Sequence, residues 1–308
     1  MVDFCGVGLM RYLGITNHIW ISTTPIHDTV IHSLGLTSPP SYVPVSEIAE
    51  VGPKMSFLER MYNFYIYLQM YRVTQMSISH TNNLFKKYAG QDFPDIREIA
   101  DDSSVVFVNS DEFLDAPRPI LHKTVYIGGV GIGESKPLEE PFKSWIKKGK
   151  LGVILFSFGT VVPTSALNLH RKMDIFLAMK DLEDYHFIVK IDKEDNVSRE
   201  LAETVNNVDV SEWIPQSDIL ESRGWGINIH RAELSGETLR NAIFQIFNNS
   251  SYKDAAIRLS KLMRSKPFTP EERFLKWTNF VLEHGKIEEL QIEGNRLTFI
   301  EYFCLDLY

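Results

Sequence analysis

The chain has 308 residues, 44% of them apolar, and a formal net charge of -8. This length predicts roughly two domains of about 150 residues, each large enough for a hydrophobic core of its own. The acidic balance, without a cluster of Lys and Arg, argues against a phosphate-binding surface, so we expect no nucleic-acid partner. Two cysteines, Cys5 and Cys304, are too few for a disulfide framework.

The first residues do not follow the pattern of a signal peptide. The segment 1–10 contains the acidic Asp3 and no basic residue. No window of the sequence reaches the roughly 18 consecutive apolar residues that a membrane span needs. We therefore expect the chain, as written, to be soluble.

Apolar runs alternate with helical patterns, which predicts an α/β fold with parallel sheets. Strands are expected at residues 18–22, 105–109, 124–127, 152–156, 186–191 and 208–210. Helices are expected at residues 165–180, 237–247, 252–264 and 271–284. The last of these has the strongest start signal, because Thr269, Pro270 and Glu272 combine an N-cap, a proline in the first turn and a capping glutamate.

Residues 56–71 form the most amphipathic segment, with a capping box predicted at Ser56 and Glu59. Its apolar side chains crowd one broad face: Phe57, Leu58, Met61, Tyr62, Phe64, Tyr65, Leu68 and Met70. We interpret this face as the packing surface of a helix on its own domain. A groove for a lipid or ligand is the alternative.

A domain boundary is predicted in residues 129–145, where Gly, Pro and charged residues cluster between two strand patterns. This segment overlaps GGVGIG at 128–133, which superficially suggests a dinucleotide-binding loop. The spacing does not match G-x-G-x-x-G, and Pro137 and Pro141 oppose the helix that such a loop needs. A dinucleotide-dependent oxidoreductase is therefore disfavoured.

Two motifs point to a nucleotide site. The first is SFGT, in which Ser157, Gly159 and Thr160 follow the strand at 152–156. Hydroxyl groups and free amides beyond the carboxyl end of a strand can hold phosphate or ribose oxygens. Taken alone, this motif is more often an ordinary turn.

The second motif is WIPQSDIL at residues 213–220. The indole of Trp213 could stack on a base, and the amide of Gln216 offers the donor and acceptor that the imide edge of uracil requires. The alternative is a buried core tryptophan beside a solvated turn glutamine. One strand–helix–strand unit separates the two motifs, which favours the nucleotide interpretation.

The sequence as a whole resembles the animal UDP-glucuronosyltransferases, within the UDP-glycosyltransferase family. The blocks that carry the resemblance occur in the family's order along nearly the whole chain. They are FCGVGLMRYLGI (4–15), PPSYVP (39–44), MSFLERMYN (55–63), VNSDEFLDAPRP (108–119), VYIGGVGI (125–132), SFGT (157–160), WIPQSDIL (213–220), RFLKWTNFVLEHG (273–285) and LTFIEYFCLDLY (297–308).

The resemblance implies an α/β fold of two Rossmann-like domains that face each other across a cleft, both incomplete in this chain. On this basis we expect a partial acceptor-binding domain at 1–131 and a linker at 132–148. We expect a UDP-sugar-binding domain at 149–267 and closing helices at 268–308.

The chemistry that the resemblance implies is sugar transfer from UDP-glucuronic acid or UDP-glucose to a small lipophilic acceptor, with inversion at the anomeric carbon. No metal or other cofactor is needed, since the UDP-sugar is a co-substrate. In this family a histidine removes the acceptor's proton and a carboxylate orients it. By matching motifs, Trp213 and Gln216 would meet the uracil, and Ser157, Gly159 and Thr160 would lie near the diphosphate.

The chain departs from the family pattern at four places. The base histidine would precede Met1, and its carboxylate partner would lie just before residue 4, where Asp3 is no obvious match. The rest of the family's donor signature is missing between Leu220 and Glu221, a gap of about two βα units. The family's C-terminal anchor in the endoplasmic reticulum membrane would begin after Tyr308.

These departures leave two hypotheses open. The chain is a UDP-glycosyltransferase, or it is a non-catalytic derivative that acts at most as a binding or partner protein. The resemblance also implies a homo-oligomer or a hetero-oligomer with full-length family members. No catalytic residue can be assigned. The first domain contains histidines that no signature distinguishes, among them His18, His27, His32 and His80.

Overall fold

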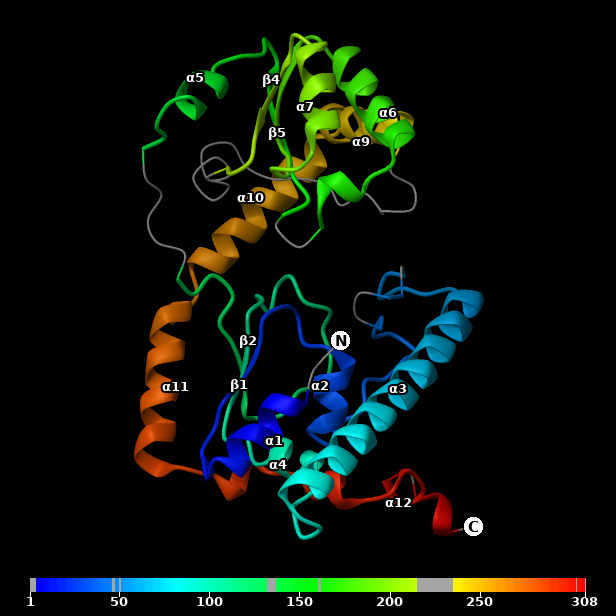
Figure 1. Ribbon diagram of the computed structural model, residues 1–308, viewed down its shortest axis with the longest axis vertical. Coiled ribbons are helices and arrows are strands. Elements are labelled where there is room, and N and C mark those ends of the chain that lie inside the picture. Colours follow the sequence, from blue (N-terminus) through cyan, green and yellow to red (C-terminus); the bar gives the residue numbers. More distant parts are fainter. Residues whose placement is uncertain are drawn as a thin grey trace. The chain divides into compact units, whose positions relative to one another are not determined.

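The computed structural model describes residues 4–45, 48–49, 51–131, 137–159, 162–214, 235–302 and 304–307. The chain divides into two compact units. The first consists of Met1–Gly131 with Met263–Tyr308, and the second of Ile132–Leu262. Each unit is built on a three-stranded parallel sheet with helices packed on it (Figure 1), which confirms the expected α/β class.

The sheet of the first unit has the order β1 (Trp20–Ser22), β2 (Val106–Val108) and β3 (Thr124–Tyr126), all parallel. All three residues of the central strand β2 are completely buried. Helix α2 (Asp28–Ser33) supplies buried apolar side chains to one face of this sheet, and α11 (Pro270–His284) packs on the other. The continuous apolar run of β2 is what a strand covered on both faces requires.

Three further helices form a second cluster of buried residues in the first unit: α1 (Cys5–Tyr12), α3 (Phe57–Ala89) and α4 (Ile96–Asp101). Helix α3 begins with the predicted capping box, in which Ser56 accepts from the backbone N–H of Glu59 and the Glu59 carboxylate accepts from the Ser56 N–H. The helix is 33 residues long, more than twice the predicted segment. It packs on its own unit through a face that includes Tyr67 and Ile78.

The crowded apolar side chains at the start of α3 are not the ones that it buries. Phe57, Leu58 and Met61 are 66%, 74% and 55% exposed, and Phe64 and Tyr65 are exposed as well. The buried positions of α3 include the polar Asn63, whose amide donates to the carbonyls of Pro40 and Val43. The prediction that this aromatic face is buried is therefore wrong. The side of α3 that carries Asn63 is buried instead, because backbone groups of the 40–45 loop hydrogen-bond to the Asn63 amide.

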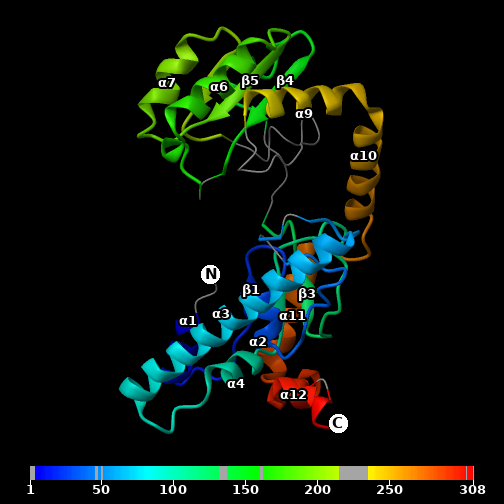
Figure 2. The ribbon, with the colours of Figure 1, turned by 90° about the vertical axis from the view of Figure 1, so that its right-hand side faces the viewer.

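The chain after α11 runs along the first unit as short helical turns (Figure 2). These are η2 (Glu288–Leu290), η3 (Glu293–Arg296), α12 (Phe299–Tyr302) and η4 (Leu305–Leu307). Ser104, just before β2, donates to the carbonyl of Gly285 at 3.0 Å. Lys123, just before β3, binds the side chain of Gln291. This segment therefore lies at the amino edge of the first sheet.

The sheet of the second unit has the order β4 (Gly152–Phe156), β5 (Tyr185–Lys190) and β6 (Val208–Ser211), again parallel. Helices α6 (Leu169–Lys180), α7 (Asn196–Glu203) and α9 (Gly236–Asn248) share one hydrophobic cluster with these strands. The short helix α5 (Phe142–Trp145) and its neighbours pack against the opposite face. A 3-10 turn, η1 (Thr164–Ala166), leads into α6, and α10 (Ser250–Arg264) follows α9.

Apart from α3, which continues far beyond the predicted segment, the strands and helices predicted from sequence are confirmed within a few residues at each end. Helix α11 starts as expected, with Thr269 accepting from the backbone N–H of Glu272 and Pro270 in the first turn. Within the part of the chain that the structure describes, no helix is both long and apolar enough to cross a membrane.

Candidate functional site

The candidate site is the carboxyl edge of the β4–β5–β6 sheet. The strands are in register, with Phe156 opposite Val189 and Val189 opposite Val210. The residues that follow β4 and β6 therefore leave the sheet at the same edge, with only β5 between them. Adjacent strands lie about 4.8 Å apart, so the two loops start roughly 10 Å from one another. Ligands in open parallel α/β sheets bind beyond this edge.

The first loop begins with Ser157, directly after β4. The hydroxyl of Ser157 accepts a hydrogen bond from the backbone N–H of Gly159 at 3.1 Å. Gly159 is exposed and has a φ of +73°, a left-handed conformation that glycine adopts without strain. Apart from its neighbours in the chain, no described residue has an atom within 4 Å of the position that a Cβ would take on Gly159. The backbone is therefore accessible here to a ligand oxygen.

The second loop presents Trp213 just after β6. The side chain of Trp213 is 71% exposed, which excludes the alternative of a buried core tryptophan. Its backbone is nevertheless held on both sides, because Ser211 donates to the Trp213 carbonyl at 2.7 Å and the next residue, Ile214, is buried. An exposed ring on a fixed backbone is a surface on which a planar base can stack.

The loops after β4 and β5 are joined at the same edge. The hydroxyl of Thr164 accepts from the backbone N–H of Asp192 at 2.9 Å. The Asp192 carboxylate in turn accepts from the N–H of Ser165 at 3.1 Å and from its hydroxyl at 3.3 Å. These bonds fix the far side of the loop that begins at Ser157.

A buried ion pair connects two of the helices next to this edge. Lys172 of α6 contacts the carboxylate of Asp195, the N-cap of α7, at 2.5 Å, and both side chains are at least 95% buried. Burial by itself would raise the pKa of Asp195, but hydrogen bonds from Lys172 and Ser198 outweigh it and lower the pKa. The pair therefore joins two of the helices that follow the strands.

Three of the five predicted site residues lie at this edge: Ser157, Gly159 and Trp213. Thr160 and Gln216 lie outside the described residues, as does the junction between Leu220 and Glu221. Sequence reasoning missed Thr164, Asp192 and the Lys172–Asp195 pair. A signal existed for Asp195 alone, because aspartate three residues before Ser198 is typical of a helix N-cap.

The four histidines singled out from the sequence occupy different surroundings. Burial lowers the pKa of His18 and of His32. His80 is exposed on α3. His27 precedes α2, just beyond the carboxyl end of β1, and its Nε2 lies 2.7 Å from the hydroxyl of Thr24. Of these four, His27 is the one at the sheet edge where an α/β fold places its ligands.

The family of the chain follows from comparison with known proteins. A family model described as "UDP-glucoronosyl and UDP-glucosyl transferase" matches residues 1–222 and 220–308. The chain belongs to this family. The resemblance seen in the sequence is thus confirmed, and the family that it identifies is one of transferases. The two matched pieces meet at residues 220–222, where the sequence predicts a missing segment.

Named relatives agree with this assignment. The Caenorhabditis elegans UDP-glucuronosyltransferase homologue ugt-50 is 35% identical over 100% of this chain and 67% of its own length. UDP-glucuronosyltransferase 1-2 of Mus musculus is 24% identical over 98% of the chain and 63% of its own. UDP-glucosyltransferase 2 of Dactylopius coccus is 25% identical over 90% of the chain and 61% of its own.

The chain therefore spans about two thirds of the length of the curated relatives that it matches. The alignment with ugt-50 extends over 352 positions, against 308 residues in this chain. Among solved structures, the glycosyltransferase of kitacinnamycin is 17% identical, with a TM-score of 0.45 over 75% of this chain and 68% of that one.

Proposed function

We propose that the second unit binds the UDP part of a UDP-sugar at the carboxyl edge of β4–β5–β6. The observation that carries this proposal is the exposed indole of Trp213 on a fixed backbone, two strands away from the open Ser157–Gly159 turn. Uracil would stack on Trp213, and diphosphate oxygens would meet the hydroxyl and amide groups after β4. Membership of the family supports the choice of nucleotide.

The sugar and the acceptor are proposed on family membership. Names in the family include glucuronosyl and glucosyl transferases, so the donor is UDP-glucuronic acid or UDP-glucose. The acceptor is a small lipophilic molecule, and the transfer inverts the anomeric carbon without a metal or cofactor. Location at the endoplasmic reticulum membrane and assembly with full-length family members are proposed on the same ground.

A second candidate function is a non-catalytic derivative that binds ligand or partner without sugar transfer. Two observations favour it. The family model matches in two pieces that meet at residues 220–222, and the alignment with ugt-50 is 44 positions longer than the chain. A segment that the relatives carry between the two pieces would then be missing from the donor site. Loss of positioning groups and of acid–base catalysis would leave turnover very low.

The test is a calorimetric titration of the purified chain with UDP and with UDP-glucuronic acid. Aromatic stacking contributes about 1–3 kcal/mol per base, so Trp213→Ala should weaken UDP binding by roughly 5- to 150-fold. Trp213→Phe retains a stacking surface and should lose less. Leu177→Ala is a matched control, because Leu177 is also exposed in the second unit, on α6, at 55%.

Saturable binding that Trp213→Ala weakens and Leu177→Ala does not would support the nucleotide site. The absence of UDP binding by the folded wild-type chain, as judged by circular dichroism, would reject it. Sugar transfer to a phenol, measured separately with each UDP-sugar, distinguishes the two functions. Transfer that depends on Trp213 would exclude the non-catalytic derivative, and binding without transfer would support it.

A further inference from the structure

The sequence contains Asn-X-Ser, the acceptor motif for N-linked oligosaccharides, at three positions: Asn196, Asn248 and Asn249. In this motif X is any residue except proline, and the sugar is attached to the side-chain amide of the asparagine. A transferase must reach that amide together with the hydroxyl of the residue two positions later. The motif is short enough to occur by chance, so the folded structure decides which copy is usable. None of the three asparagines belongs to the proposed nucleotide site.

The motif at Asn196 is closed by packing in the folded chain. Asn196 is the first residue of α7 and is exposed, but Ser198, which carries the hydroxyl of this motif, is only 3% exposed. The Ser198 hydroxyl donates to the Asp195 carboxylate at 2.7 Å, and that carboxylate also contacts Lys172. A transferase could reach this hydroxyl only after α7 had unfolded. The copy at Asn196 is therefore unusable in the folded second unit.

The motifs at Asn248 and Asn249 overlap in the turn between α9 and α10, where the chain changes direction (Figure 2). Asn248 is completed by Ser250, and Asn249 by Ser251. All four residues are exposed. Exposed surface segments are where N-linked oligosaccharides occur, because the attached sugar is bulky and must remain in solvent. The turn therefore offers an accessible asparagine and an accessible serine in both copies.

The backbone distinguishes the two asparagines of this turn. Asn248 is the last residue of α9, and a transferase could bend the chain there only by unwinding the end of the helix. Asn249 follows the helix and is extended, with a φ of -126° and a ψ of 100°. Its N–H donates to the carbonyl of Ile246 at 3.4 Å, and its carbonyl accepts from the N–H of Tyr252 at 3.3 Å. Asn249 is thus held between the two helices on a fixed backbone.

The side chain of Asn249 already contacts the other end of its motif. Its Oδ1 accepts a hydrogen bond from the backbone N–H of Ser251 at 3.0 Å, which makes an Asx-turn. This bond places the amide beside the residue whose hydroxyl completes the motif. Because Oδ1 holds the turn together, Nδ2, the atom to which a sugar is attached, is not needed for that bond. The folded chain therefore presents Asn249 and Ser251 as a unit.

The aromatic rings around Asn249 suit an attached sugar. Phe247, two residues before it, is 51% exposed although its ring contacts that of Tyr185, with the ring centroids 4.8 Å apart. Phe244, one turn earlier on α9, and Tyr252 on α10 are exposed too. A group of exposed aromatic rings is unfavourable in water. A bulky polar oligosaccharide on Asn249 would shield these rings from water.

We propose that Asn249 is an N-glycosylation site, at which the chain accepts an oligosaccharide from a lipid-pyrophosphate donor. Nδ2 of Asn249 forms a bond to the anomeric carbon of the first sugar while the bond from that carbon to the pyrophosphate oxygen breaks. The lipid pyrophosphate leaves with the electron pair of the broken bond, and the amide loses one proton to a basic group of the oligosaccharyltransferase. In the cell this donor is used in the lumen of the endoplasmic reticulum, so modification there rests on the location proposed above.

The experiment supplies the donor and the transferase, so it depends neither on that location nor on UDP binding. The purified full chain, shown to be folded by circular dichroism, is incubated with a purified single-subunit oligosaccharyltransferase and a synthetic lipid-pyrophosphate-linked chitobiose. Intact-mass and peptide mass spectrometry then locate the added sugar. We expect the folded chain to gain one chitobiose, on Asn249, while Asn196 remains unmodified. In a tryptic digest of the same chain, Asn196 should be modified as well.

The two serines of the turn give a matched pair of variants. Ser251→Ala removes only the hydroxyl of the Asn249 motif and should abolish the added mass. Ser250→Ala removes only the hydroxyl of the Asn248 motif and should leave the modification unchanged. Ser251→Thr keeps a hydroxyl at the required position and should be modified like the wild-type chain. Both serines are exposed, so all three variants should fold normally.

The proposal is wrong if the folded wild-type chain gains no sugar on Asn249. It is also wrong if the sugar persists in Ser251→Ala and is lost in Ser250→Ala, because the acceptor is then Asn248. Equal modification of Asn196 and Asn249 in the folded chain would contradict the structural reason for choosing Asn249. The calorimetric titration with UDP has a different readout, so a failure of the nucleotide site and a failure of this inference are distinguishable.

Discussion

The first unit and the second unit have sheets of the same topology but bury them differently. In the first, every residue of the central strand β2 is inaccessible to solvent, with α2 on one face and α11 on the other. In the second, the central strand β5 is buried as well, except for Lys190 at its end, but every residue of the edge strand β4 is partly exposed. Each edge strand of the first sheet, β1 and β3, still contains one buried residue. One face carries α6, α7 and α9, whereas the apolar residues packed on the other are mostly half-buried.

The difference indicates where each unit obtains its stability. The burial of apolar surface is the dominant favourable contribution to folding. On the α5 face of the second unit, that burial is incomplete. A structure with one weakly covered face is also the expected result if a segment present in the relatives is missing after β6. Substitutions in each of the two units can test this difference in burial.

The largest expected effect comes from the two sheet faces themselves. Phe107 of β2 is completely buried, so Phe107→Ala should cost about 3–5 kcal/mol in the free energy of unfolding of the first unit. Leu155 of β4 is only partly buried on the α5 face, so Leu155→Ala should cost the second unit about 1–2 kcal/mol. Amide hydrogen exchange in urea, read separately on peptides from β2 and β4, measures each unit by itself.

Similar costs for both changes would contradict the comparison, because they would mean that the α5 face is packed as tightly as the first sheet. Phe187→Ala is the internal reference. Phe187 is fully buried on the well-covered face of the second sheet and should match Phe107→Ala.

The next effect concerns the ion pair beneath the candidate nucleotide site. Asp195→Asn keeps the helix N-cap but leaves the buried ammonium of Lys172 without its charge partner, which should cost about 3–5 kcal/mol in the second unit. Combining it with Lys172→Met removes both charges and should restore most of the loss. Arg199→Ala, in a half-exposed pair with Glu212, should cost less than about 1 kcal/mol.

The same pair predicts a dependence on pH. The pKa of Asp195 in the folded chain lies below its ordinary value of 3.8. Its contribution to stability is therefore complete above that value and is lost as the pH falls through the folded pKa. Between pH 7 and the acid range, the free energy of unfolding of the second unit should therefore fall further in the wild-type chain than in Asp195→Asn, because only the wild-type chain has this carboxylate to protonate. An unchanged acid profile in Asp195→Asn would exclude this group as a cause.

The smallest effects are expected at helix starts, where the two units use the same device. Thr269 caps α11 in the first unit and Ser235 caps α9 in the second, each by accepting from the backbone N–H three residues on. Replacing either by alanine should cost about 1 kcal/mol in its own unit. Thr269→Ser, which keeps the hydroxyl, should be nearly neutral. Thermal unfolding and hydrogen exchange measure the stability of each unit. If Thr269→Ala destabilised the second unit instead of the first, the assignment of α11 to the first unit would be contradicted.

Local sequence patterns were sufficient for most of the elements. Each of the six predicted strands is present, since short apolar runs bounded by turn residues have few other stable arrangements. Residues 56–71 show where such patterns fail. The capping box was correct, but the aromatic face was predicted to be buried and is exposed, because Asn63 and the 40–45 loop decide which side of α3 packs.

The sequence predicted the part of the candidate site that follows directly from the ends of parallel strands. Ser157 and Trp213 each follow a strand of one parallel sheet, and the carboxyl ends of such strands must meet at one edge. Asp192 and Lys172 could not be assigned in the same way. One charged residue after a strand and one lysine within a helix are ordinary surface patterns, and their partners lie 27 and 23 residues away.

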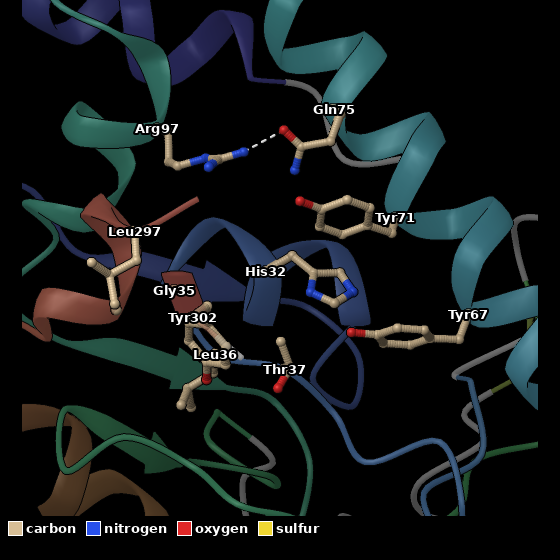
Figure 3. Close-up of a pocket in the computed structure, with 11 residues that line it drawn as sticks. His32, Gly35, Leu36, Thr37, Tyr67, Tyr71, Gln75, Arg97, Leu297 and Tyr302 are labelled. Atoms are coloured by element: carbon tan, nitrogen blue, oxygen red, sulfur yellow. Dashed lines mark hydrogen bonds between the residues drawn. The ribbon is translucent and has the colours of Figure 1, made fainter. Parts of the chain in front are cut away.

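Sequence patterns were sufficient for the elements, their caps, the family and the edge at which the nucleotide site is proposed. Each of these depends on residues close together in the chain or on an ordered set of motifs. Two features follow only from the three-dimensional packing: the indole of Trp213 is exposed, and Nε2 of His32 (Figure 3) is buried without a hydrogen-bond partner among the described residues. Burial and unmet hydrogen bonds arise from contacts between distant segments, and local pattern carries no information about them.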